Sequence, residues 1–380
     1  MVTPPPPTAP TRTCAACRVT AHRGTVGRIA AGAMLAATFL MPSLAQATPA
    51  DTGLARARQA LEEMSAADGT ATGNDWRHIH AWQRFVIVST LSDYERLSGD
   101  TRFDTAASRA LANRQGLDGN DDDLWVAQAD LDMARIAHAS DRMADARRIF
   151  DMVAGRYWDT TCNGGVWWDH ARTYKNAITN ELFIATAVRL YQQTHEDTYR
   201  DWARRGWAWL RDSGMVNASG LVNDGLDAHC ANNAGPAYSY NQGVILDALA
   251  GVAALTHDAR ATDMATRIAL AATAAATDPH GTVHEAREPM GTDARIFRGI
   301  FVRALGHFVP TLPDGPQRAT LSDWLAHESD RVWATRHPPA RFSATWTAHP
   351  FQPGAQAQLT AAALFIATAQ DGGHTREQAP

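Results

Sequence analysis

The stretch from residue 119 to residue 136 reads GNDDDLWVAQADLDMARI. After the three aspartates, Asp121 to Asp123, apolar side chains recur at helical spacing as far as Ile136, which predicts a helix that begins at the aspartates. Aspartate is favoured in a first turn because its oxygens accept unpaired backbone N–H groups and the helix dipole favours negative charge there. One aspartate suffices for that role, and three adjacent carboxylates repel one another. The run is therefore either a solvated helix cap or a pair of reactive carboxyl groups beside Trp125.

Three other interpretations of the acidic run fail on spacing. The metal-binding Asp-Asp-x-x-Asp motif of terpenoid synthases needs an aspartate where this chain has Trp125 or Val126. An EF-hand that starts at Asp118 needs glycine and glutamate at its sixth and twelfth positions, which are Asp123 and Ala129. Phosphate-binding loops need glycines at fixed offsets beside a strand, and no stretch provides them. Two carboxyl groups beside an aromatic side chain are, in contrast, what cleavage of a glycosidic bond requires.

The pattern beyond residue 47 is helical almost throughout, and strand alternation is not evident over any useful length. Asn176 and Asp258 are among the residues that suit helix starts. The predicted helices lie near 51–67, 76–98, 101–116, 122–139, 141–157, 176–194, 196–212, 240–256, 259–276, 294–310, 314–333 and 356–370. The sequence therefore predicts an all-α fold.

Short and long connections alternate between most of these helices. The long ones span 158–175, 213–239, 277–293 and 334–355, and loops of such length are uncommon unless they are functional. In an up-and-down array, this alternation places every long loop on one face, before the even-numbered helices. We therefore predict an (α/α)6 barrel, a toroid of six helical hairpins in two rings, with the even helices inside and one depression among the long loops.

Polar and aromatic residues gather where the even helices are expected to begin. The stretches concerned are DDD at 121–123, GGVWWD at 164–169, YKNAITNE at 174–181, YSYNQG at 238–243 and FRGIF at 297–301, together with Asp293, Trp346, Gln356 and Gln358. Helix capping explains any one of these clusters. It does not explain their recurrence at the same end of four or five alternate helices.

These stretches resemble, in order, those of glycoside hydrolase family 76, the endo-α-1,6-mannanases, over roughly residues 75–370. The resemblance implies an (α/α)6 barrel, retaining hydrolysis of α-1,6-mannosidic linkages and no metal or organic cofactor. It places Asp121 on the family's nucleophile and Asp122 on its acid/base, with Asp123 where the family varies. The chain departs from the family at Arg298, where lysine is usual, and its loop 284–293 lacks the cysteines of some members.

The chemistry agrees with these two roles. A retaining glycosidase needs two carboxyl groups about 5–5.5 Å apart. Successive helical residues point about 100° apart, so neighbours reach that separation only at a helix start or in a loop. The helix dipole favours Asp121 as an anion, and an anionic neighbour raises the pKa of Asp122.

Further residues are expected to contact a mannan oligosaccharide or polysaccharide. The candidates are Trp125, Trp167, Trp168, Asn176, Tyr240, Asn241, Gln242, Arg298 and Trp346. The tryptophans are candidate sugar platforms, although Trp125 is equally suited to the core. Tyr240, Asn241 and Gln242 could bond mannose hydroxyls or orient the aspartate pair. Lys175, the only lysine in the chain, is expected near the site as a structural counter-charge.

Composition and the first segment indicate the compartment. The 380 residues carry a net charge of −5 and no basic stripe, so no nucleic-acid partner is expected. Residues 1–47 have the arginines, the short apolar run and the small-residue cleavage site of a signal peptide, with an uncleaved membrane anchor as the alternative. We expect an exported monomer, periplasmic or secreted, with no stable membrane insertion after cleavage. Residues 48–375 would form the catalytic domain and residues 376–380 a disordered tail.

Two cysteines, Cys162 and Cys230, remain after the expected cleavage and lie in neighbouring long loops. In an exported protein such a pair predicts a disulfide, with two free thiols as the alternative.

Three alternative functions stay open. A transglycosidase would use the same two carboxyl groups and differ only in the acceptor. A non-catalytic glycan-binding protein would not need the intact Asp121–Asp122 pair. A polysaccharide lyase on the same fold would use a tyrosine or histidine base, for which His170, His229 and His284 are the candidates.

Overall fold

A computed structural model of the protein describes residues 48–68, 76, 79–137, 139–277, 284–287 and 289–377. The chain from Gln46 to Pro380 forms one compact unit. The expected signal segment, 1–47, lies outside the described residues, as do the last three residues of the expected tail. Among the described helices, none is long and apolar enough to cross a membrane.

Twelve α-helices make up the described part of the chain, which contains isolated β-bridges but no strand, so the predicted fold class is confirmed. Two short 3-10 helices, Thr161–Asn163 and Val309–Thr311, accompany them. The α-helices are α1 (Pro49–Asp68), α2 (Ala81–Ser98), α3 (Asp104–Ala112), α4 (Asn120–Ala137), α5 (Ser140–Tyr157), α6 (Ala177–Thr194), α7 (Asp197–Asp212), α8 (Ser239–Thr256), α9 (Ala259–Ala276), α10 (Ala294–Phe308), α11 (Pro316–Ala334) and α12 (Ala355–Glu377).

Helix ends differ from the prediction mainly at α2, α3 and α12. The α3 helix ends at Ala112 instead of continuing to residue 116. The reason is a buried guanidinium: Arg84 of α2 donates to the carbonyl oxygens of Asn113, at 3.1 Å, and Gln115, at 3.2 Å. These carbonyls are therefore satisfied outside a helix. In contrast, α12 continues beyond the predicted end at 370 to Glu377, and α2 begins only at Ala81.

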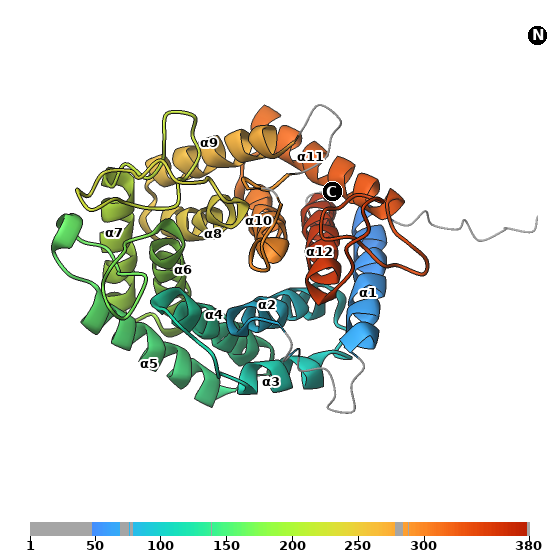
Figure 1. The fold of residues 1–380 in the computed structure, drawn as a ribbon, viewed down its shortest axis with the longest axis horizontal. Coiled ribbons are helices and arrows are strands. Elements are labelled where there is room, and N and C mark those ends of the chain that lie inside the picture. The colour runs from blue at the N-terminus through green and yellow to red at the C-terminus, as the bar shows by residue number, and fades with distance from the viewer. Residues whose placement is uncertain are drawn as a thin grey trace, which may run out of the picture. The chain divides into compact units, whose positions relative to one another are not determined.

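The even-numbered helices form a closed inner ring, and the odd-numbered helices surround it (Figure 1). Around the inner ring, each even helix packs on the next, and α12 returns to α2. Each outer helix packs mainly on an even neighbour, as α5 does on α4, α7 on α6 and α9 on α8. This is the (α/α)6 toroid that the alternation of loop lengths predicts.

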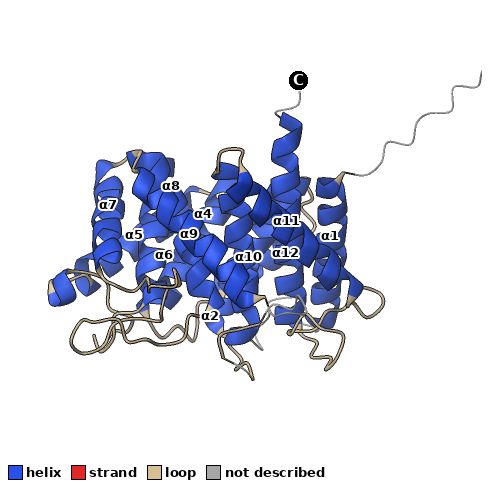
Figure 2. Ribbon diagram, turned by 90° about the horizontal axis from the view of Figure 1, so that it is seen from above, coloured by secondary structure: helices blue, strands red, loops and turns tan. Residues whose placement is uncertain are grey.

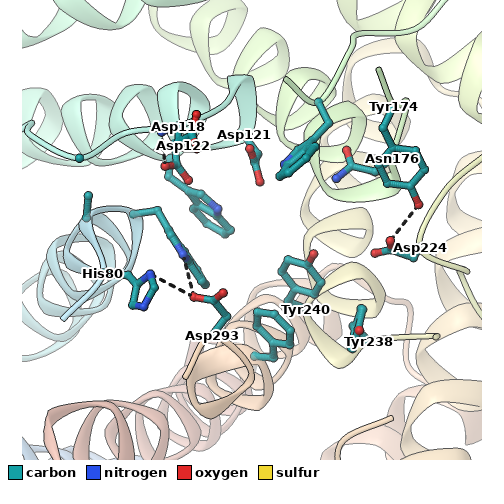
Figure 3. A pocket seen from close by; sticks show the side chains of 16 residues that line it. His80, Asp118, Asp121, Asp122, Tyr174, Asn176, Asp224, Tyr238, Tyr240 and Asp293 are labelled. Carbon is teal, nitrogen blue, oxygen red and sulfur yellow. Dashed lines mark hydrogen bonds and ion pairs between the residues drawn. The ribbon is translucent and has the colours of Figure 1, made fainter. Parts of the chain in front are cut away.

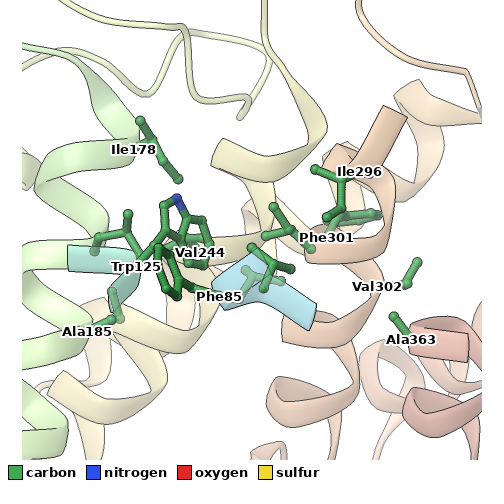
Figure 4. Packing of buried hydrophobic residues seen from close by; sticks show 14 of the residues in the cluster. Phe85, Trp125, Ile178, Ala185, Val244, Ile296, Phe301, Val302 and Ala363 are labelled. Atoms are coloured by element: carbon green, nitrogen blue, oxygen red, sulfur yellow. The ribbon is translucent and has the colours of Figure 1, made fainter. Parts of the chain in front are cut away.

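The two rings differ in how much of each helix is buried. The inner helix α6 buries almost every residue from Ala177 to Leu190, whereas the outer helix α7 buries mainly one face. Apolar side chains of the inner helices pack together inside the ring, among them Phe85, Trp125 and Phe301 (Figure 4). Close packing also restricts side-chain size: a Cβ at Gly243 of α8 would lie 2.7 Å from the Cα of Phe301. Helices buried all round show little amphipathic periodicity.

Charged side chains gather near the C-terminal ends of the inner helices, around a cavity of about 390 Å³. His307 lies between two carboxylates, with Nδ1 3.0 Å from Asp247 and Nε2 3.0 Å from Asp93. Arg303 donates to Asp93 at 2.6 Å, and Arg189 donates to Asp132 at 2.6 Å. Burial alone would lower the pKa of His307, but the two carboxylates raise it to about 9. Cations are favoured here because helix C-termini carry partial negative charge.

The long loops gather along the opposite edge of the barrel, as predicted (Figure 2). Cys162 and Cys230 form the predicted disulfide, with their Cα atoms 5.2 Å apart, and join the loops that precede α6 and α8. These same two loops also pair through backbone hydrogen bonds, from Ala177 to Asp224 and from Leu226 to Lys175. The disulfide and the pairing together fix the loops over the N-terminal ends of the inner helices.

Candidate active site

A cavity of about 440 Å³ opens among the long loops, at the N-terminal ends of the inner helices (Figure 3). Six of the predicted site residues line it: Asp121, Asp122, Trp125, Trp168, Asn176 and Tyr240. Tyr174, Tyr238, Asp293 and Phe297, which also line it, come from stretches that the sequence singles out. The prediction missed His80, Trp82, Asp118 and Asp224. These four are single polar or aromatic residues outside the recognised stretches, so no sequence pattern indicates them.

The aspartate pair occupies the first turn of α4 and is held there by the residue before it. The backbone nitrogen of Asn120 donates to the carbonyl of Trp168 at 2.8 Å, and its side-chain amide donates to the carbonyl of Trp167 at 2.7 Å. Gly119 permits the close fit, because a Cβ there would lie 2.7 Å from Oδ1 of Asp121. The start of α4 and the loop before α6 therefore form one rigid unit.

The environment of the pair raises both of its pKa values. Burial and the neighbouring Asp122 raise the pKa of Asp121 to about 8. Burial also raises the pKa of Asp122 to about 6, although the backbone N–H of Asp118, 2.9 Å from Oδ2, lowers it. The sequence predicts an ionised Asp121, so this order differs from the expectation: burial of Asp121 outweighs the helix dipole. Between the two values the pair carries one proton, which the two interacting carboxyl groups share.

The third aspartate, Asp123, does not line the cavity. Its Oδ2 lies 3.5 Å from Nε2 of His170, whose ring stacks on Tyr157 at 5.2 Å. Asp123 therefore lies outside the cavity lining, beside His170.

One side of the cavity is built by Tyr174, Asn176 and Asp224. The hydroxyl of Tyr174 donates to Asp224 at 2.8 Å and accepts from Asn233 at 2.7 Å. Burial raises the pKa of Asp224, while Tyr174 and Asn241 favour its ionised form. Asn176 caps α6 by accepting from the backbone nitrogen of Thr179 at 3.3 Å. A carboxylate, a phenol and an amide are thus presented together to a ligand.

Aromatic rings form the floor and the opposite wall. Tyr240 stacks on Phe297 with their centroids 3.9 Å apart, and Trp82 stacks on Trp125 at 6.1 Å. Trp125 is only 4% exposed, so it serves the core and the cavity wall at once. Trp168 is 37% exposed and is the large apolar side chain best placed to meet a sugar. Stacked rings of this kind suit the apolar faces of sugars.

A buried acid lies near Tyr240 of this floor. Glu181 of α6 is fully buried, and among the described residues neither of its carboxyl oxygens has a hydrogen-bond partner. Burial and the nearby Asp224 raise its pKa well above the usual value. Burial also raises the pKa of Tyr240 well above the usual value, which leaves no tyrosinate to act as a base.

Five predicted substrate-binding residues do not line the cavity: Trp167, Asn241, Gln242, Arg298 and Trp346. Trp346 is fully buried, and its Nε1 donates to Thr360 at 3.1 Å, so no sugar can stack on it in this conformation. Arg298 is buried against its ring, 5.5 Å from the centroid. These two residues support the wall around α10 and α12 instead of contacting a ligand.

The other three support the loops. Gln242 bonds the backbone nitrogen and oxygen of Val222, both at 2.8 Å, and so positions the segment that carries Asp224. Asn241 is buried beside Asp224. Trp167 donates through Nε1 to Asp159 at 2.7 Å.

Lys175 is buried as a structural cation. Its ammonium group donates to Asp159 at 2.9 Å and to the carbonyls of Thr161 and Gly164, each at 2.7 Å, and lies 4.6 Å from the ring centre of Trp167. Three acceptors converge on one nitrogen, a geometry that suits ammonium better than a planar guanidinium. Lys175 therefore stabilises the loop before α6.

The histidine candidates for a lyase base, His170, His229 and His284, all lie outside the cavity lining. Within the described residues, no group of three or more His, Cys, Asp or Glu side chains is arranged to hold a metal ion.

Comparison with known proteins identifies relatives of this chain. The family model for glycosyl hydrolase family 76 matches residues 51–375. The mannan endo-1,6-alpha-mannosidase DCW1 of Candida albicans is 26% identical over 240 residues, which cover 57% of this chain and 52% of that protein. The chain spans about half the length of the curated relatives it matches.

Solved structures share the fold. The α-1,6-mannanase GH76A of Salegentibacter sp. HEL1_6 has a TM-score of 0.75 at 21% identity, over 83% of this chain and 99% of that one. An inactive variant of GH76A, with two consecutive aspartates replaced by alanine, was solved with α-1,6-mannotetrose. It has a TM-score of 0.73 at 21% identity, over 83% of this chain and 98% of that one. Dfg5 of Chaetomium thermophilum, solved with glucosamine, has a TM-score of 0.71 at 21% identity, over 84% and 90%. With most of its length matched by the family model, the chain belongs to glycosyl hydrolase family 76.

Proposed function

We propose that this protein cleaves α-1,6-mannosidic linkages inside mannan-type chains with retention of configuration. The observation that carries the proposal is the adjacent pair Asp121 and Asp122, half-buried in the first turn of α4 and lining one cavity. With pKa values raised by burial to about 8 and about 6, the pair would consist of one carboxylate and one carboxylic acid between these pH values. A retaining glycosidase needs this state, one carboxylate and one carboxylic acid. Relatives named mannan endo-1,6-alpha-mannosidase, and a structural neighbour solved with α-1,6-mannotetrose after loss of two consecutive aspartates, support the choice of substrate.

The reaction would proceed in two displacements. Asp122 donates its proton to the glycosidic oxygen while the carboxylate of Asp121 attacks C1, so that the C1–O bond to the leaving sugar breaks and a mannosyl ester forms. Asp122, now ionised, removes a proton from water, whose oxygen attacks C1 and releases Asp121. Two inversions at C1 return the α-configuration. This reaction requires the proton of the pair to lie on Asp122 once the sugar is bound. An ionised Asp121 then stabilises the positive charge that develops at C1 as the bond to the leaving sugar breaks.

The shape of the cavity supports cleavage within a chain. Trp168, Tyr240 and Trp82 present aromatic surface on several sides of one open cavity, which suits consecutive sugars better than a closed single-sugar pocket. We propose that the protein acts as a monomer, without metal or organic cofactor. We also propose that residues 48–375 form the catalytic domain of a protein exported to the periplasm or secreted.

Digestion of linear α-1,6-mannan tests the function. Wild-type protein should release a spread of oligosaccharides early, in the presence of EDTA as well as in its absence. Asp121→Asn and Asp122→Asn should each lower the rate by at least about 100-fold, since general acid catalysis alone contributes 10²–10⁴-fold. Asp123→Asn, which alters the carboxylate beside His170, is the matched control and should retain most activity. Mannose as the sole early product would contradict an endo-acting enzyme.

Transfer to a sugar acceptor is a second candidate function, and one observation favours it. His80 and Asp293, each with a side chain 52% exposed, lie on the open side of the cavity and leave room for an acceptor. Transfer and hydrolysis share the mannosyl ester and differ in the attacking hydroxyl. Product analysis with and without added α-1,6-mannobiose distinguishes them, because a transferase forms longer oligosaccharides at the expense of hydrolysis.

A further inference from the structure

The two carboxyl groups of the pair face different sides of the cavity. In Figure 3, Asp122 lies beside Asp118 and toward His80 and Asp293, whereas Asp121 lies toward Asn176, Tyr174 and Asp224. The electrostatics agree, because Asp293 is among the charges that raise the pKa of Asp122. The cavity therefore has a nucleophile side and an acid/base side.

The acid/base side is built by a network that joins three inner helices. Oδ1 of Asp293 accepts from Nε1 of Trp82 at 3.3 Å and lies 3.6 Å from Nδ1 of His80. Gln83 of α2 donates to the carbonyl of Thr292 at 3.2 Å and accepts from Gln356 of α12 at 3.1 Å. The start of α10 is thus fixed against α2 and α12.

The Asp293 carboxylate accepts from Trp82 and Gln83 of α2 through one oxygen, Oδ1. It stands at the N-cap of α10 but makes no capping hydrogen bond, and His80 stands at the N-cap of α2 without one either. The described contacts of the Asp293 carboxylate all reach Oδ1, which leaves Oδ2 able to accept a hydrogen bond from a hydroxyl. The contact between the exposed side chains of Asp293 and His80 contributes little stability.

We propose that Asp293, His80 and Trp82 form the subsite for the leaving mannose, and hence for the acceptor in the reverse direction. The proposal rests on the proposed function. The glycosidic oxygen joins C1 of the attacked sugar to C6 of the leaving sugar, so the group that protonates it must face the leaving sugar. Trp82 supplies a ring for an apolar sugar face, and the carboxylate and imidazole supply hydrogen-bond partners for hydroxyls. The attacked sugar then lies on the side of Tyr174 and Asp224.

Two glycosyl donors distinguish the acid/base side of the cavity from the nucleophile side. The first is α-1,6-mannotetraose, whose cleavage needs a sugar on the acid/base side. The second is the α-fluoride of α-1,6-mannobiose, in which the C1–F bond breaks, the bond from Asp121 to C1 forms, and fluoride leaves without a proton. The readout is the ratio of kcat/KM for mannotetraose to kcat/KM for the fluoride.

Asp293→Asn and His80→Ala should lower this ratio, by about tenfold or more for Asp293, because a hydrogen bond to a charged group is lost. Tyr174→Phe, on the other side, is the matched control: both kcat/KM values should fall together and the ratio should stay constant. Melting temperatures confirm that the variants fold, and His80, being exposed, provides a second variant if the first is unstable. With the fluoride as donor and α-1,6-mannobiose as acceptor, Asp293→Asn should also lower the ratio of transfer to hydrolysis.

Three results would overturn the assignment. One is an unchanged ratio in Asp293→Asn and His80→Ala when the wild type cleaves both donors. Another is a fall in kcat/KM for mannotetraose in Asp293→Asn that is explained entirely by a shift of the alkaline limb of the pH profile. Asp293 would then affect the proton of Asp122 and would not bind a sugar. Wild-type protein that turns over neither donor would overturn the proposed function and this subsite together.

Discussion

The backbone nitrogen of Asn120 donates a 2.8 Å hydrogen bond to the carbonyl oxygen of Trp168. This bond joins the first turn of α4, which carries the aspartate pair, to the most exposed tryptophan of the cavity. Together with the side-chain bond from Asn120 to Trp167, it holds the Asp121–Asp122 pair close to Trp168, the ring that we propose as a sugar platform.

Asn120→Ala should therefore lower activity without preventing folding. The substitution removes the 2.7 Å bond to the half-buried carbonyl of Trp167 and should loosen the loop before α6. The loss of one buried hydrogen bond costs about 1–3 kcal/mol. We expect kcat on α-1,6-mannan to fall at least about tenfold, because a misplaced catalytic group is costly. Asn113→Ala, which alters an asparagine at the end of α3, is the control, and an equal loss in both variants would contradict a specific role for Asn120.

Activity should follow a bell-shaped pH profile with limbs near pH 6 and pH 8. Below about 6 both carboxyl groups are protonated and the nucleophile is lost, and above about 8 both are ionised and the acid is lost. A profile of kcat/KM against pH measures both limbs. A rate that stays constant from pH 7 to pH 10 would contradict the shared proton.

The same burial makes Asp121 a source of instability. Its pKa is about 8 in the folded protein and 3.8 ordinarily, so the folded state binds a proton that the unfolded state has lost between these values. Its contribution to the unfolding free energy therefore falls as the pH rises from about 4 to about 8. Asp121→Asn should be more stable than wild type by a margin that grows over this range.

Asp159→Asn provides a control in which the expected change in stability is opposite to that of Asp121→Asn. Burial tends to raise the pKa of Asp159, but Lys175 and Trp167 lower it to about 2, so its stabilisation is present above pH 3.8 and is lost as the pH falls through about 2. This variant should be less stable than wild type at pH 7. Melting temperatures at pH 4.5, 6 and 7.5 measure both effects, and a destabilised Asp121→Asn at pH 7.5 would contradict the account.

The fold was largely predictable, because it depends on patterns that repeat. The alternation of short and long loops indicates two rings, and apolar spacing indicates where most helices lie. The end of α3 was not predictable, because it depends on Arg84 reaching the carbonyls of Asn113 and Gln115. That contact joins residues of different helices and leaves no local signal.

The site was predictable only where residues stand in recognisable stretches. Asp121, Asp122, Trp168 and Tyr240 do so, whereas Asp224 reaches the cavity because Gln242 binds the backbone of Val222. Tryptophan in a long loop indicates a sugar platform at Trp346 as well as at Trp168. The two differ in packing, which the sequence does not show: Trp346 is fully buried, and Trp168 is 37% exposed.

The charged cluster at the far end of the barrel should make stability depend on alkaline pH. The pKa of His307 is about 9 in the folded protein and 6.5 ordinarily, so its contribution is complete below pH 6.5 and is lost as the pH rises through about 9. Urea unfolding should show the difference between wild type and His307→Gln shrinking over this range, by at most about 1.4 kcal/mol per pH unit. A difference that is constant from pH 6 to pH 9.5 would show that His307 is not charged there.

We propose that Asp121 forms a covalent bond to the sugar during cleavage of an α-1,6-mannan chain. Proton NMR of the anomeric signals during the first minutes of digestion tests it most directly, before mutarotation mixes the anomers. A covalent intermediate on Asp121 predicts that the new reducing ends appear first as the α-anomer, with β signals growing only later. New reducing ends that appear first as the β-anomer would show a single displacement by water and would contradict the role of Asp121 as nucleophile.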